Sequence, residues 1–149
     1  MMNAIRTVFA FFAAAITTYL LAAIFYTQQI LAKQAEIGAN YTPEETFETY
    51  LANLTGLAPA YGLVLTIGLL IAFIVAFGIK RVIRPLAPIA YPVAGAAAVF
   101  TAIYLIENVM AGGGAGAIGG ARTTVGLALQ CLAGAIGGIV FAVLRPHQN

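Results

Sequence analysis

The sequence feature that most restricts the fold of this chain is an uninterrupted apolar run from Leu57 to Ile79. The run consists largely of Leu, Ile, Val and Phe and contains no charged residue. At 1.5 Å per helical residue, it is long enough to cross the roughly 30 Å hydrocarbon core of a bilayer. Each of these large side chains favours membrane insertion by about 0.3 to 0.6 kcal/mol. The run therefore predicts a transmembrane helix.

Three further apolar stretches are also long enough to cross a membrane. With the first run, the predicted spans are residues 8–31, 57–79, 86–110 and 123–144. The stretch at 8–31 follows Arg6 in a pattern that signal peptides share, and we expect it to be retained as an anchor. Of the 149 residues, 62% are hydrophobic and only 8% are charged, whereas about a quarter of a soluble domain is charged. We expect an all-α membrane protein, with four transmembrane helices in a bundle that forms a single domain over residues 1–149.

Basic residues are distributed unevenly between the two sides of this predicted bundle. One side holds Arg6, Lys80, Arg81, Arg84 and Arg145, and the other holds Lys33 and Arg122. Because short cytoplasmic loops carry the excess of Lys and Arg, the first side is predicted to be cytoplasmic, with both termini. Aromatic rings at Tyr26, Tyr61 and Tyr91 fall near the predicted interfaces. We expect a plasma membrane location, in a bacterium the inner membrane.

A short amphipathic helix is predicted at residues 43–55, in the first outer loop. Thr42 is a candidate N-cap, Pro43 suits the first helical position, Glu45 completes a capping box, and Gly56 is the expected stop. Its apolar face consists of Phe47, Tyr50, Leu51 and Leu54. This face has two interpretations: it covers the interface or its own bundle, or it meets a partner. The acidic opposite face disfavours anionic headgroups, so a protein is the better partner.

Glycine is concentrated in the second half of the chain. The segment 112–120 reads GGGAGAIGG and contains G-x-G-x-x-G, but no strand precedes it and no acid follows Glu107, so we expect no nucleotide binding. A pliable outer loop is the better interpretation. In the fourth span, Gly126, Gly134 and Gly138 share one face. Small residues at this spacing let helices approach closely, either within the chain or at a subunit interface.

A polar pocket is predicted in the outer half of the bundle. Its candidate residues are Thr101, Tyr104, Glu107 and Asn108 of the third span, with Arg122 and Gln130 before and within the fourth. If the two sets face each other, they line a shallow pocket with Glu107 and Arg122 at its mouth. Alternatively, the charged side chains of Glu107 and Arg122 form a structural salt bridge or extend toward the water at the membrane surface.

The sequence contains no recognisable catalytic or metal-binding set. One Cys, at position 131, and one His, at position 147, give neither a nucleophile–base pair nor a multi-ligand metal site, so we expect no cofactor and no enzyme activity. A net charge of +2 does not suggest nucleic-acid binding. We expect a non-catalytic multi-pass membrane protein that acts as a homo-oligomer or as an accessory subunit of a larger membrane complex. The alternative is a small transporter or channel component that uses the polar pocket.

Overall fold

The computed structural model of the chain describes residues 2–82, 88–110 and 121–145, and every regular element within them is a helix. Four of these helices are long and apolar enough to cross a membrane. They contain α1 (Met2–Glu36), α3 (Leu63–Val82), α4 (Ala90–Leu105) and α5 (Thr124–Leu144). The second span begins with a further helix, α2 (Pro43–Leu57), and the third continues past α4 to Val109. The predicted all-α bundle with four spans and one additional helix is confirmed. The glycine-rich segment 112–120 lies outside the described residues.

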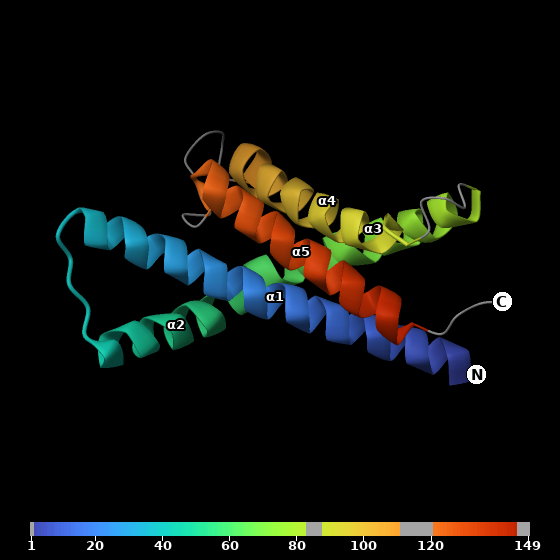
Figure 1. Cartoon of the computed structure of the whole chain (residues 1–149), viewed down its shortest axis with the longest axis horizontal. Coiled ribbons are helices and arrows are strands. Elements are labelled where there is room, and N and C mark those ends of the chain that lie inside the picture. The colour runs from blue at the N-terminus through green and yellow to red at the C-terminus, as the bar shows by residue number, and fades with distance from the viewer. Residues whose placement is uncertain (1, 83–87, 111–120, 146–149) are drawn as a thin grey trace.

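The helix α5 occupies the centre of the bundle (Figure 1). It packs along α1 on one side and along α4 on the other, and α3 packs mainly on α4. The side of α1 that meets α5 is made of small residues: Ala10, Ala14, Thr18 and Ala22 recur every fourth position and are all 0% exposed. Short side chains on this face allow the two helix backbones to approach each other closely.

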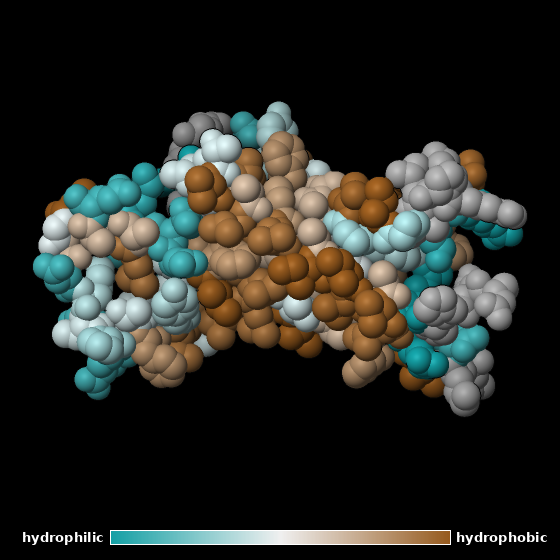
Figure 2. Space-filling model, viewed as in Figure 1, coloured by the Kyte–Doolittle hydropathy of each residue, from teal (hydrophilic) through white to brown (hydrophobic). Residues whose placement is uncertain are grey.

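The outer surface of the molecule is divided along its long axis. Hydrophilic side chains gather at both ends, and a hydrophobic band lies between them (Figure 2). The first residues of α1 and the last residues of α5 lie at one end, together with Lys80, Arg81 and Arg145. We call this the basic end and the opposite end the hairpin end. This pattern is typical of a helical bundle in a bilayer, with its polar ends in water.

The first helix is longer than the predicted span of 8–31. It has 35 residues, which at 1.5 Å per residue is about 52 Å and exceeds the hydrocarbon thickness. It ends at a Schellman motif: Gly38 has a φ of 89°, its N–H donates to the Ala35 carbonyl, and the Ala39 N–H donates to the Gln34 carbonyl. The end of α1 therefore projects beyond the membrane.

The predicted outer helix forms, but it does not end at Gly56. Thr42 and Glu45 make the expected capping box, and the helix then continues through Leu57. A π turn, η1 (Ala58–Gly62), joins it to α3, with Pro59 near the start of the turn. Gly56 was the wrong stop, because the following residues keep helical backbone angles and the π turn accommodates the proline.

Together, the outer end of α1 and α2 form an antiparallel pair that we call the projecting hairpin, residues 27–57. Figure 1 shows α2 running back beside α1, beyond the end of α5, and then continuing into α3. The helix α2 thus extends roughly along the bundle instead of lying flat across its end. The helices α2 and α3, with the π turn between them, form one nearly continuous rod from Pro43 to Val82.

Candidate functional site

The predicted polar residues of the third span lie at the hairpin end of α4 and in the π turn η3 (Ile106–Met110) that follows it. Thr101, Tyr104 and Asn108 are exposed, and Glu107 is half-buried. The Asn108 amide donates a hydrogen bond of 2.9 Å to the Tyr104 carbonyl of its own helix. These four residues therefore lie along the continuous helical segment formed by α4 and η3, and three of them are exposed.

Gln130 lies apart from that stripe, in the interior of the bundle. Its side chain is 0% exposed. Its Oε1 accepts a hydrogen bond of 2.9 Å from the Tyr61 hydroxyl, and its Nε2 donates one of 3.0 Å to the Ala22 carbonyl. Gln130 thus connects α5 to α1 and to the turn before α3. Its amide is used for helix packing instead of facing Thr101 across an open pocket.

Two of the aromatic rings that were expected near the interfaces are packed inside the bundle. Tyr61 and Tyr91 are only 3% and 4% exposed, so both belong to the core. Their position in the sequence gave no sign of this, because a tyrosine near a span end suits either environment. Arg122 is exposed just before α5. A pocket mouth formed by Glu107 and Arg122 stays a prediction, since residues 111–120 between them lie outside the described part.

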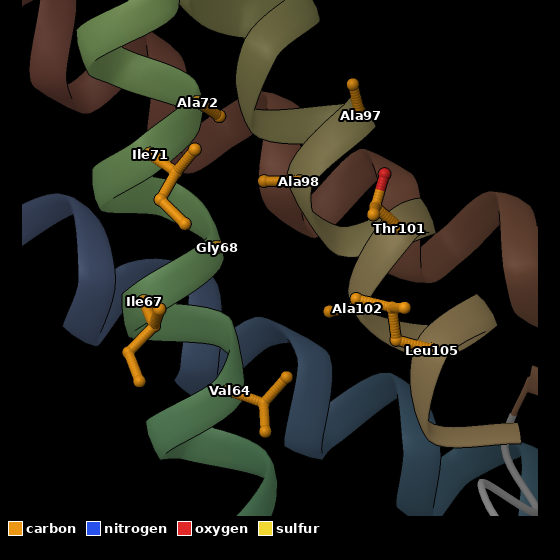
Figure 3. A pocket seen from close by; sticks show the side chains of 10 residues that line it. All are labelled: Val64, Ile67, Gly68, Ile71, Ala72, Ala97, Ala98, Thr101, Ala102 and Leu105. Atoms are coloured by element: carbon orange, nitrogen blue, oxygen red, sulfur yellow. The ribbon is translucent and has the colours of Figure 1, made fainter. Parts of the chain in front are cut away.

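Thr101 lies at the edge of a groove between α3 and α4 (Figure 3). The groove has a volume of about 370 Å³, and Thr101 is its one hydroxyl-bearing wall residue among Ala, Gly, Val, Ile and Leu. Ile67 and Ile71 line its α3 side and are 50% and 59% exposed. Such a surface suits lipid chains, and it offers a polar solute no set of binding groups.

The predicted glycine face of α5 packs inside the chain. A Cβ atom on Gly134 would collide with the Gly95 carbonyl of α4, and one on Gly138 would collide with the Tyr91 carbonyl. Gly126 is buried as well. On the neighbouring face, a Cβ on Gly137 would collide with the Thr18 hydroxyl of α1. This geometry supports the intramolecular interpretation of the glycine face.

The predicted apolar face of α2 is divided between two environments. Tyr50 and Leu54 are half-buried, whereas Phe47 is 64% exposed and Leu51 is 47% exposed. No residue of α2 is buried. Phe47 and Leu51, which we call the exposed hairpin face, are one helical turn apart and therefore neighbours on the surface.

Two side-chain contacts hold α2 on α1. The Asn53 Nδ2 donates a hydrogen bond of 3.2 Å to the Thr27 hydroxyl, and the Tyr19 hydroxyl donates one to the Leu54 carbonyl. Thr27 is itself buried and donates to the Ala23 carbonyl of its own helix at 2.9 Å. These contacts fix the rotation of α2 about its axis and therefore the direction in which its exposed face points.

Comparison with known protein families, curated proteins and solved structures finds no match to this chain. Within the described residues, no group of three or more His, Cys, Asp or Glu side chains is placed to hold a metal ion. The fold and surface themselves define the class: an all-α membrane protein of four spans with a helical hairpin at one end.

Proposed function

We propose that this protein is a non-catalytic, multi-pass membrane protein that serves as an accessory subunit of a larger membrane complex and binds its partner through the projecting hairpin. The observation that carries this proposal is the exposed hairpin face on α2, a capped helix of 15 residues with none of them buried. Apolar residues at i and i+4 are the anchors of helix-in-groove recognition. Phe47 and Leu51 provide such a pair.

The hairpin is built as a preorganised binding element. Continuity with α3 and the hydrogen bonds to Thr27 and from Tyr19 restrict how α2 can move. A partner therefore does not have to order a flexible segment when it binds, which lowers the entropic cost of association. These features support binding of a folded protein surface.

The charges around the exposed hairpin face favour a different protein over a second copy or a lipid surface. Glu44, Glu45 and Glu48 lie on the same helix, and all three are exposed. A second copy would bring another acidic helix against this one, and like charges disfavour such an interface. Anionic headgroups would be repelled in the same way. The best complement is an apolar groove with basic residues at its rim.

We also propose that the basic end faces the cytoplasm and that the membrane is a bacterial inner membrane. The start of α1 and the end of α5 share that end of the bundle. The excess of Lys and Arg there supports a cytoplasmic position, and the acidic hairpin then lies on the opposite side of the membrane.

Site-specific photo-crosslinking in intact cells tests the proposed partner contact. A photoreactive residue at Phe47 or at Leu51 is expected to give one discrete crosslinked product that contains a second, different polypeptide. The control position is Ile16, which is 58% exposed on the membrane-spanning part of α1 and should crosslink to lipid.

Two results would count against this function. If every crosslinked product joins two copies of the chain, the protein is a homo-oligomer and the accessory-subunit function is wrong. If Phe47 gives only the background crosslinking seen at Ile16, the proposed partner contact through the hairpin is wrong.

A further inference from the structure

The basic end of the bundle contains a compact aromatic cluster. The rings of Phe73 and Phe141 stack with centroids 4.5 Å apart, and Tyr91 meets them edge-on at 5.7 and 4.9 Å. All three are at least 95% buried. The cluster joins α3, α4 and α5 at the level where the spans approach the membrane boundary.

Two cations lie against this cluster. The Lys80 Nζ is 5.5 Å from the centroid of the Tyr91 ring, and the Arg145 Cζ is 5.4 Å from it. Both cations also approach the ring of Phe77, at 6.0 and 4.7 Å. The aromatic faces attract the cations, but they place two like charges close together.

No acidic side chain balances this pair. The sequence has no Asp, and its Glu residues are Glu36, Glu44, Glu45, Glu48 and Glu107. All of these lie on elements at the hairpin end. Burial lowers the pKa of the Arg145 guanidinium, but a guanidinium stays charged because its ordinary pKa lies far above neutrality. Within the described residues, the two cations therefore form a site that favours an anion.

An apolar groove between α1 and α3 leads to Arg145, and Lys80 lies beyond its lining, against the same Phe77 and Tyr91 rings as Arg145. The groove has a volume of about 380 Å³, with Phe11 and Phe73 on its walls and Thr7 and Arg145 as its polar lining residues. Thr7 and Arg145 lie at the basic end, so the groove is apolar in the membrane interior and becomes polar toward the membrane boundary. Ile74, on its rim, is 64% exposed at the lipid-facing surface. An acyl chain can therefore enter from the side.

We infer that this groove binds an acyl chain of an anionic phospholipid, with the headgroup phosphate held by Arg145 and Lys80. A guanidinium forms two parallel hydrogen bonds to phosphate oxygens, and the adjacent ammonium adds a second positive charge. Basic pockets between membrane helices at the cytoplasmic boundary bind anionic headgroups in this way. A small soluble phosphate has no group to fill the apolar part, so the occupant is a lipid.

Native mass spectrometry of the full-length, delipidated protein in a mild detergent tests this inference. The probes are phosphatidylglycerol, phosphatidylcholine and soluble glycerol 3-phosphate. We expect one tightly retained phosphatidylglycerol per chain, about tenfold weaker retention of phosphatidylcholine, and no retained glycerol phosphate. Equal retention of the two lipids, or retention of glycerol phosphate as strong as that of phosphatidylglycerol, would overturn the inference.

Matched variants separate the two halves of the site. Arg145→Gln and Lys80→Gln should each lower phosphatidylglycerol retention about tenfold, whereas Arg81→Gln, at an exposed neighbouring position, should not. Ile74→Trp should fill the groove and reduce binding, whereas Ile16→Trp, at a 58% exposed position outside it, should not. Arg145→Lys keeps the charge and should retain part of the binding. If Arg81→Gln lowers phosphatidylglycerol retention as much as Arg145→Gln does, the lipid responds to general surface charge, and the inferred site is overturned.

Discussion

The hydroxyl of Tyr61 donates a hydrogen bond of 2.9 Å to the Oε1 of Gln130, across 69 positions of the sequence. Gln130 also donates to the Ala22 carbonyl, so one buried amide connects three helical elements. In hydrocarbon an unsatisfied polar group is costly, and the pairing is therefore strongly preferred over other helix registers. This network fixes how α1, the turn before α3 and α5 align.

The coupling between Tyr61 and Gln130 should be measurable in a double-mutant cycle. We expect Tyr61→Phe and Gln130→Met each to lower the free energy of unfolding in detergent, with a coupling energy of about 0.6 kcal/mol and at most about 1.7 kcal/mol. Thr7→Ala combined with Gln130→Met is the control, because the Thr7 hydroxyl bonds only within its own helix, to the Asn3 carbonyl. A zero coupling energy for Tyr61 and Gln130 would show that the hydrogen bond contributes nothing.

Gly134 is a position where an added methyl group should be tolerated poorly. Gly134→Ala places a Cβ against the Gly95 carbonyl and the Val99 side chain, and overpacking of this kind lowers the free energy of unfolding by about 1–3 kcal/mol. Gly78→Ala is the matched control, because a Cβ there meets nothing within 4 Å. We expect this control to be neutral or to stabilise the helix by up to about 1 kcal/mol. Equal unfolding curves for the two variants would contradict the close α4–α5 packing.

The capping box should determine how well the start of α2 is ordered. The Thr42 hydroxyl accepts from the Glu45 N–H at 3.2 Å, and the Glu45 carboxylate accepts from the Thr42 N–H at 2.8 Å. Thr42→Ala removes the first bond and should destabilise the first turn by about 0.5–2 kcal/mol. Hydrogen exchange of the amides of residues 44–47 measures this. Thr49→Ala, which loses only a bond to its own helix's Glu45 carbonyl, should accelerate exchange less, and the reverse order would refute the cap's role.

The proposed orientation places Asn3 and Ala39 on opposite sides of the membrane. In a background lacking the native Cys131, Ala39→Cys should react with a membrane-impermeant maleimide in intact cells. Asn3→Cys and Gln148→Cys should react only after permeabilisation, because the positive-inside rule places both termini in the cytoplasm. Labelling of Asn3→Cys in intact cells would reverse the orientation, and different behaviour of Asn3→Cys and Gln148→Cys would contradict an even number of spans.

Some of the candidate sites could be anticipated from short stretches of sequence. The capping box at Thr42 and Glu45 forms as expected, because a cap depends on residues three positions apart. The glycine face of α5 could be recognised from its spacing, but its neighbour Gly95 could not be assigned. The Schellman turn at Gly38 also had a signal in the sequence, a glycine after a long helix. The length of the apolar run, from which the span was predicted, does not include this signal.

By itself, the sequence determined the number of spans, their approximate positions and the start of the outer helix. These properties follow from the length of apolar runs and from local capping, which do not depend on distant residues. Only the tertiary structure decided that α5 is central, that Gln130 pairs with Tyr61 and that Phe47 stays exposed while Leu54 turns toward α1. The rotation and neighbours of each helix depend on the sum of contacts between segments far apart in the chain, and no local pattern specifies that sum.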